Sequence, residues 1–147
     1  MNTHSAEILI PVPSSLKKTE GKLALNRLST FFVHENFINL KSDLEKLFLT
    51  LQMNVKSESE TADIVLNYDA SMANGAWRMS ITPDGISAAA GDKNGALYAV
   101  YALAQILFAA AIKGLMEDTI DCAEISDEPR FEWRGFMLDE GRHFYGK

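Results

Sequence analysis

The sequence predicts an α+β fold in which a mainly antiparallel sheet carries two helices packed on one face. Two runs of alternating residues joined by a tight turn predict a hairpin over Ala76–Thr82 and Gly85–Ala90. Two longer segments repeat apolar residues every three or four positions, which is the period of an amphipathic helix. The candidates follow one another as strands, helix, strands, helix and strand, an order typical of helices layered on a sheet.

The N-terminal part of the chain contains two strand candidates. Ile8–Ile10 is a short apolar run that stops at Pro11, which favours an edge strand entering a turn. Gly21 interrupts the polar segment that follows. The β-branched and aromatic run Thr30–Val33 is the second candidate.

A helix is expected next, with Asn36 as its cap. Its apolar face is spaced at three and four residues and consists of Phe37, Leu40, Leu44, Leu47, Phe48 and Leu51. Asp63–Tyr68 then alternates as a strand does, with Val65 on the opposite side from its neighbours.

The hairpin and the second helix are the clearest predictions. The turn is Pro83-Asp84-Gly85, in which proline presets φ and glycine accepts a positive φ. A helix is predicted over about Asn94–Ile112, with Gly114 as its stop. Its many alanines would let it lie close to the sheet. We expect its buried stripe to consist of Leu97, Val100, Tyr101, Ala104, Leu107, Phe108 and Ala111.

The end of the chain changes in character. Asp121–Arg130 is acidic and polar, which is typical of a linker, and Phe131–Leu138 follows as a compact strand candidate. A single strand behind a linker has no partner left in this chain with which to form a sheet. We therefore expect one domain over residues 1–126 and, over residues 127–147, a linker and the first strand of a truncated second domain.

Composition and charge exclude several classes of protein. A chain of 147 residues with 47% hydrophobic and 23% charged residues is typical of a globular protein with one core. A net charge of −6 without a basic patch argues against nucleic acid as a partner. No segment reaches the roughly 18 apolar residues of a membrane span, so no membrane partner is expected. The single cysteine, Cys122, cannot form an internal disulfide and is expected to be buried.

The cellular location stays open. Met1–Glu7 lacks the basic end and the apolar run of a signal peptide. The protein is therefore expected to be cytoplasmic, or its parent is periplasmic or extracellular and a leader has been removed.

Several motifs resemble one family. The run Pro129–Phe144 resembles the start of the catalytic domain of family 20 glycoside hydrolases, the β-N-acetylhexosaminidases, whose pattern P-R-[FY]-x-[WH]-R-G-x-x-L-D-x-x-R-H-[FY] it matches without a gap. Ile10–Ser14 resembles the family's opening segment. Ile81–Ile86 resembles its hairpin, and Gly95–Ala99 with Leu103–Gln105 resembles its following helix.

The resemblance implies an N-terminal non-catalytic α+β domain followed by the first strand of a (β/α)8 barrel, a fold that needs roughly 250 residues. The intact enzyme would remove terminal N-acetylhexosamine from glycans or chito-oligosaccharides by retaining hydrolysis. In that reaction the substrate's acetamido group acts as nucleophile and an Asp-Glu pair assists. No cofactor or metal is implied. The implied partners are the rest of the barrel and, only in the intact enzyme, an N-acetylhexosaminide; self-association of the fragment is expected from its uncovered apolar surface.

No catalytic residue is expected in this chain, which is therefore expected to be inactive alone. Asp127-Glu128 lies in the expected linker and is interpreted as a solvated turn, and Glu140 of Asp139-Glu140 occupies a variable position of the pattern. Arg134 is the one substrate-binding candidate, because its family counterpart contacts sugar hydroxyls and a guanidinium fork suits two adjacent oxygens. A salt bridge from Arg134 to Asp139 or Glu132 is the alternative.

Other candidate residues receive structural interpretations. Trp77 and Trp133 are expected to lie in a core, and His143 to be an oriented structural group. His4 and His34 have no carboxylate or cysteine partners at metal-ligand spacing. Two other functions stay open: the front domain of another barrel glycosidase, of the α-glucuronidase or O-GlcNAc hydrolase type, or a stand-alone interaction or carbohydrate-binding module.

Overall fold

The computed structural model describes residues 5–112, 118–131, 133 and 135. The chain forms seven strands, two α-helices and three 3-10 helices, the last labelled η. In chain order these are η1 (Ser5–Ile8), β1 (Ser15–Ala24), η2 (Leu25–Arg27), β2 (Thr30–Val33), η3 (Glu35–Leu40), α1 (Lys41–Thr50), β3 (Lys56–Ser57), β4 (Ile64–Tyr68), β5 (Trp77–Thr82), β6 (Gly85–Ala90), α2 (Lys93–Ile112) and β7 (Thr119–Asp127).

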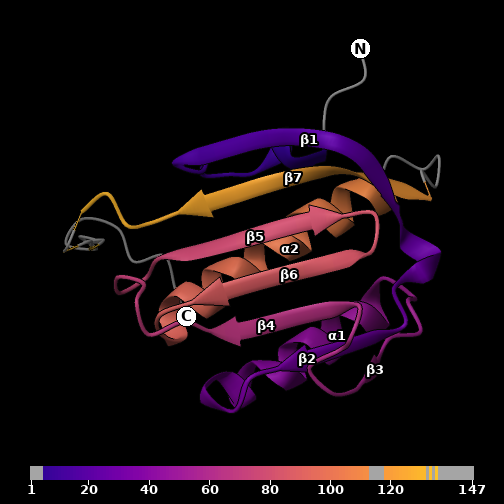
Figure 1. Ribbon diagram of the computed structural model, residues 1–147, viewed down its shortest axis with the longest axis horizontal. Coiled ribbons are helices and arrows are strands. Elements are labelled where there is room, and N and C mark those ends of the chain that lie inside the picture. Colours follow the sequence, from indigo (N-terminus) through magenta and orange to yellow (C-terminus); the bar gives the residue numbers. More distant parts are fainter. Residues whose placement is uncertain (1–4, 113–117, 132, 134, 136–147) are drawn as a thin grey trace, which may run out of the picture.

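All seven strands belong to one sheet with the order β1-β7-β5-β6-β4-β2-β3 (Figure 1). The ladders β1–β7, β7–β5 and β5–β6 are antiparallel and hold most of the paired residues, whereas β6–β4, β4–β2 and β2–β3 are parallel. The mainly antiparallel sheet and the hairpin of β5 and β6 are thus confirmed. Parallel strands need a crossover, and α1 provides it between β2 and β4.

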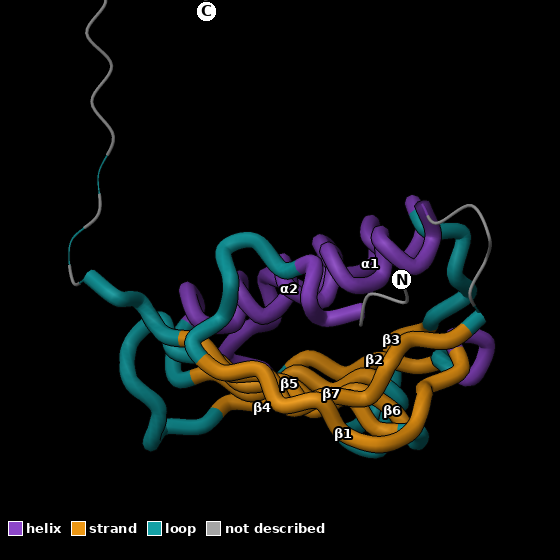
Figure 2. The backbone as a smooth tube through the Cα atoms, turned by 90° about the horizontal axis from the view of Figure 1, so that it is seen from above, coloured by secondary structure: helices purple, strands orange, loops and turns teal. Residues whose placement is uncertain are grey.

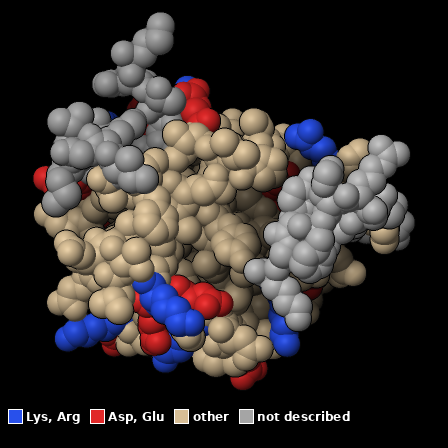
Figure 3. All heavy atoms as spheres, turned by 180° about the vertical axis from the view of Figure 1, so that it is seen from behind, with Lys and Arg blue, Asp and Glu red and all other residues tan. Residues whose placement is uncertain are grey.

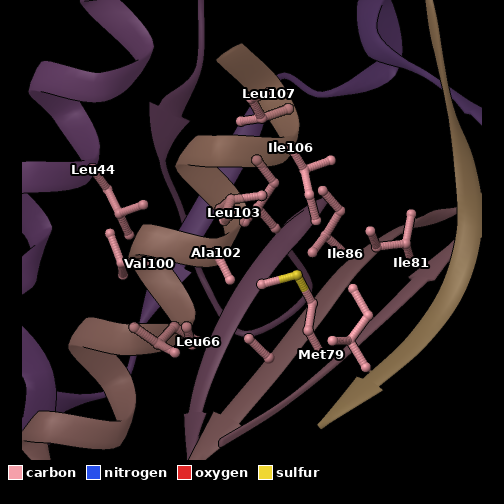
Figure 4. Close-up of a cluster of buried hydrophobic side chains, with 14 of the residues drawn as sticks. Leu44, Leu66, Met79, Ile81, Ile86, Val100, Ala102, Leu103, Ile106 and Leu107 are labelled. Carbon is pink, nitrogen blue, oxygen red and sulfur yellow. The ribbon is translucent and has the colours of Figure 1, made fainter. Parts of the chain in front are cut away.

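Both α-helices lie on the same face of the sheet, as predicted (Figure 2). The core lies between the two layers, where Leu66, Met79, Ile81 and Ile86 from the strands point toward α2 (Figure 4). The alternation of side chains along a strand explains why these residues reach the core, because every second residue of β5 and β6 faces the helices. Within the described residues, no α-helix lies on the opposite face of the sheet.

The N-terminal prediction was wrong in its details. The apolar run Ile8–Ile10 forms no strand: η1 ends at Ile8, and the chain then continues as an irregular arm to Ser14. The long strand β1, which was not predicted, follows and passes through Gly21, whose φ of 106° accommodates a register shift against β7.

The first helix begins later than expected. Glu35–Leu40 is a 3-10 segment, and Phe37 has a non-helical backbone (φ −119°, ψ 15°). The cap is not Asn36, because the Nδ1 atom of His34 accepts a hydrogen bond from the backbone N–H of Asn36 at 3.2 Å. The α-helical part, α1, buries Leu44, Leu47 and Phe48 against the sheet, as the spacing predicted.

The linker prediction was wrong for residues 121–127. They belong to β7, which lies between β1 and β5 and buries Ile120, Ala123 and Ile125. A polar composition was misleading here because the two flanking strands satisfy the backbone of β7 on both edges. Phe131, Trp133 and Gly135 lie in no strand, and the remainder of the predicted strand Phe131–Leu138, like Gly114, lies outside the described residues.

One carboxylate joins the starts of β2 and β4. The Oδ2 atom of Asp63 accepts hydrogen bonds from the backbone N–H and the hydroxyl of Ser29 (2.8 and 2.9 Å) and from those of Thr30 (3.0 and 3.1 Å). The N–H of Asp63 in turn donates to the Thr30 hydroxyl at 3.0 Å. The Ser29 N–H, ahead of the other donors, lowers the pKa of Asp63 below its usual value, because these bonds stabilise the charged form.

The start of α2 fits closely into the loop before β5. The Oδ1 atom of Asp92 caps the helix by accepting from the N–H of Gly95 at 2.8 Å, and it also accepts from the N–H of Gly75 at 2.9 Å. A Cβ atom at Gly95 would lie 2.3 Å from the carbonyl oxygen of Ala76. Glycine is therefore required at this position by space.

Replacing Asp63 by asparagine tests the role of its charge. We expect Asp63→Asn to lower the free energy of unfolding by about 1–3 kcal/mol at neutral pH, because hydrogen bonds to a carboxylate lose their charge assistance. The pKa of Asp63 is lower in the folded state, so its contribution is present above pH 3.8 and is lost as the pH falls through the folded pKa. Urea unfolding at neutral and acidic pH should therefore show the deficit shrinking in acid.

The control for this variant is Asp84→Asn, whose side chain is 90% exposed and meets Arg27 at only 3.7 Å. It should change stability little at either pH. A deficit of Asp63→Asn that stays constant or grows in acid would contradict the assigned role.

Replacing Gly95 by alanine tests the close fit of α2. Alanine gains about 1 kcal/mol of helix propensity over glycine, but the added Cβ would collide with backbone. We expect a net loss of about 1 kcal/mol or more in thermal or urea unfolding, because overpacking against a fixed backbone outweighs propensity. Asn94→Ala, at an exposed neighbouring position, should be neutral or stabilising. A Gly95→Ala variant as stable as the original chain would show that α2 can move outward at no cost.

Candidate functional site

A large hollow of the described surface runs along the outer side of α2. It has a volume of about 870 Å³ and is walled by three segments: α2, the N-terminal arm (residues 8–13) and the chain exit (residues 127–131), where the chain leaves the sheet. We call it the α2 groove. Its lining is mostly apolar and includes Ile10, Val12, Tyr98, Tyr101 and Phe108.

The outer side of α2 forms the floor of the α2 groove. The predicted buried stripe is right for Val100 and Leu107, which are 6% and 1% exposed, and wrong for Tyr101 and Ala111, which are exposed. The buried side is completed by Ala96, Ala99, Leu103 and Ile106. The expectation that alanines let the helix lie close to the sheet is met at the start of α2, where Ala96 and Ala99 are at most 1% exposed.

The arm is held against α2 by a side-chain amide. Gln105 accepts a hydrogen bond from the N–H of Ile10 at 2.9 Å through Oε1, and its Nε2 donates to the carbonyl oxygen of Ile10 at 3.2 Å. A glutamine amide has one acceptor and two donors, so it can replace the edge of a β-strand for one residue. The arm is thereby fixed without forming a strand.

The arm is also joined to the chain exit. The Oδ1 atom of Asp127 accepts from the N–H of Ser14 at 3.0 Å and from its hydroxyl at 2.6 Å, and the Arg130 guanidinium donates to the carbonyl oxygen of Val12 at 3.5 Å. Asp127 was interpreted as part of a solvated turn. It is instead the last residue of β7, and its carboxylate accepts hydrogen bonds from Ser14 at the end of the arm.

The chain exit is packed against the start of α2. Gly75, with φ of +75°, lies beneath Pro129, and a Cβ at Gly75 would meet the proline ring at 2.6 Å and Tyr98 at 3.7 Å. Since Asp92 holds both Gly75 and the first turn of α2, the exit has a defined position relative to the helix. The three walls of the α2 groove are therefore fixed to one another.

Charge is almost absent from α2, and the charged residues of the groove lie in the chain exit. Of the 20 residues of α2, only Lys93 at its first position is charged. Seen from the helix side, uncharged residues cover most of the middle of the molecule, which is hollowed, and charged groups gather toward the rim (Figure 3). An uncharged, hollowed and mostly apolar surface of this kind is typical of a site that another surface covers.

The open face of the sheet is different in character. It carries a polar hollow of about 590 Å³ in which Arg78 meets Asp69 at 2.8 Å and the Ser80 hydroxyl donates to Glu124 at 2.6 Å. Hydrogen bonds from Ser71, followed by the charge of Arg78, lower the pKa of Asp69. These polar groups satisfy one another, as on an ordinary hydrated sheet face.

Metal ligands do not cluster among the described residues. No three His, Cys, Asp or Glu side chains in that part of the chain could share a metal ion. Cys122 is 1% exposed, as predicted, and burial, with a smaller effect of the Asp121 charge, raises the pKa of its thiol. A buried thiol of raised pKa is a poor nucleophile.

The predicted site residues lie at the end of the chain. Arg134, the substrate-binding candidate, lies outside the described residues, as do Asp139-Glu140 and His143. Trp77 is buried (5% exposed), as expected, whereas Trp133 is 83% exposed and lies in no core. The residues that sequence reasoning missed are those of the α2 groove, above all Gln105 and Asp127. The single charge in α2 was the signal that could have indicated the groove.

Helix α2 is long and mostly apolar. Lys93–Ala111 is long and apolar enough to cross a membrane by those criteria alone, but half of it is buried inside the fold. The core helix of a globular domain passes the same test, so this is weak evidence for a membrane span.

Comparison with known proteins gives a consistent result. The chain is 30% identical over 152 residues to a β-hexosaminidase of Vibrio vulnificus, covering 97% of this chain and 16% of that protein. It is 40% identical over 78 residues to an N,N'-diacetylchitobiase of Vibrio harveyi, covering 50% of this chain and 8% of that protein. The curated relatives are much longer: the chain spans between 8% and 24% of their length.

The solved structures agree with the sequence matches. The β-N-acetylhexosaminidase of Bacteroides fragilis is similar with a TM-score of 0.71 at 28% identity, over 92% of this chain and 28% of that one. Residues 6–128 match the family described as glycosyl hydrolase family 20, domain 2. The chain therefore belongs to glycosyl hydrolase family 20, of which it represents domain 2.

Proposed function

We propose that this chain is the non-catalytic N-terminal domain of a β-N-acetylhexosaminidase and that it docks on the catalytic domain through the α2 groove. The observation that carries the proposal is the position of the groove: its mostly apolar floor on α2, a helix with one charged residue, lies directly beside residues 127–131, where the chain leaves the sheet. In the relatives, most of the chain lies outside the matched part.

Burial of the groove would be favourable for a simple physical reason. Apolar surface removed from water contributes roughly 25 cal/mol per Å², and an uncharged helix loses no hydrated charge on docking. A domain that follows the exit is tethered close by, so association is intramolecular and needs little intrinsic affinity. The domain would then act as a support for the barrel.

The proposed division of labour follows the sequence. Residues 1–126 form the auxiliary domain, and residues 127–147 carry the connection and the first barrel strand. Arg134 contacts hydroxyls of the bound sugar, and the catalytic Asp-Glu pair lies further along the barrel. The enzyme removes terminal N-acetylhexosamine from glycans or chito-oligosaccharides with the substrate's acetamido group as nucleophile.

The proposal predicts that the chain is inactive alone. We expect the purified 147 residues to release no aryl alcohol from an aryl N-acetylglucosaminide above the buffer blank, because the proposed catalytic Asp-Glu pair lies further along the barrel and Asp127 of the groove is hydrogen-bonded to Ser14. A complete family 20 enzyme at equal concentration is the positive control. Hydrolysis by the chain at the rate of the control would contradict the assignment of a non-catalytic role.

The uncovered groove predicts self-association. We expect sedimentation velocity to show concentration-dependent association of the chain, because no described segment covers the apolar lining of the groove. Tyr101→Glu places a charge on the exposed centre of the helix and should weaken association roughly tenfold or more. Leu49→Glu, at a 78% exposed apolar residue of α1, should leave it unchanged. A chain that stays monomeric at all concentrations would contradict this prediction.

A further inference from the structure

The arm displays two apolar side chains to solvent although its path is fixed. Ile10 is 79% exposed and Val12 is 69% exposed, whereas Leu9 before them is 3% exposed and Pro13 after them is buried. Leu9 and Pro13 therefore anchor the arm, and all three residues between them face water: Pro11 and the branched apolar Ile10 and Val12. Solvation alone gives no reason for apolar residues at these outward positions.

The long-range hydrogen bonds of the arm run inward. Both backbone groups of Ile10 bond to Gln105, the carbonyl oxygen of Val12 accepts from Arg130, and Ser14 bonds to Asp127. The partners are 95 to 118 residues away in the sequence, so these contacts exist only in the folded domain. The outward side of the arm is left with the side chains of Ile10 and Val12 as its main features.

Such an arrangement is well suited to binding. Binding costs entropy for each side chain and segment that becomes ordered. The arm is already ordered by its contacts, and β-branched side chains have few rotamers to lose. Ile10 and Val12 would therefore contact a partner at a low entropic cost. Because they are apolar and lie beside the mostly apolar groove, the partner's contacting side chains are expected to be apolar as well.

We propose that Ile10 and Val12 are contact residues for apolar side chains of the catalytic domain, with the arm forming the outer wall of the docking interface. This inference rests on the proposed function and adds to it the side of α2 on which the interface lies. The arm and the chain exit share the α2 groove and are hydrogen-bonded to each other, so a domain that follows the exit meets the arm first.

Thiol labelling at single sites tests the proposal. The variants Ile10→Cys, Val12→Cys, Tyr101→Cys and Leu49→Cys each place a thiol at an exposed apolar position. The native Cys122 gives little background because it is 1% exposed. The labelling rate by a soluble maleimide is measured for each variant in the 147-residue chain at low concentration and in the complete enzyme. Urea unfolding shows that each variant is folded.

We expect labelling of Ile10→Cys, Val12→Cys and Tyr101→Cys to be about tenfold or more slower in the complete enzyme, and labelling of Leu49→Cys to be unchanged, because a docked site reacts only when it opens. Slow labelling at Tyr101→Cys with unchanged rates at both arm sites would overturn this inference and leave the proposed function intact. Unchanged rates at all four sites would overturn the docking itself. Equal slowing at all four sites would overturn the placement of the interface on the groove side of α2.

Discussion

The close approach of α2 to the sheet is the constraint on which the rest of the structure depends. Gly95 leaves space for the carbonyl oxygen of Ala76, and the inner side of the helix continues with Ala96 and Ala99, which are at most 1% exposed. Strand β6 of the sheet also contributes alanines to the core. Small side chains on both surfaces bring the two backbones together, and larger ones would force the layers apart.

The same constraint produces the α2 groove. Alanines and aliphatic residues occupy the inner side of α2, and its aromatic residues lie on the flank and the outer side, where Tyr98, Tyr101 and Phe108 line the groove. The tight start of the helix also fixes the loop that carries Gly75, and Gly75 receives Pro129 at the chain exit. The packing of the core and the shape of the groove therefore both depend on which residues of α2 face the sheet.

The sequence predicted those elements whose pattern is local. The hairpin of β5 and β6 and the positions of both helices follow from alternation and from three-and-four spacing. Strand β1 was missed because it is mostly polar and is stabilised by pairing with the distant β7. The arm was mistaken for a strand because its backbone partner is the side chain of Gln105, 95 residues away. The buried stripe of α2 was predicted only in part: Val100 and Leu107 are buried, but Ala96 and Ala99, rather than Tyr101, complete the buried side at the start of the helix.

The groove could not be predicted from the sequence because three distant segments form it. The charge content of the two helices nevertheless indicates that the outer side of α2 is unusual. Both helices cover the same face of the sheet, but α1 places Lys41, Asp43, Glu45 and Lys46 among its 10 residues, whereas α2 has one charge among 20. A helix that keeps one side in water normally carries charges there. Burial against the sheet explains the inner side of α2 but not its outer side. A second covering surface would explain both sides, and the docking that we propose provides one; in the relatives, most of the chain lies outside the part that matches this domain.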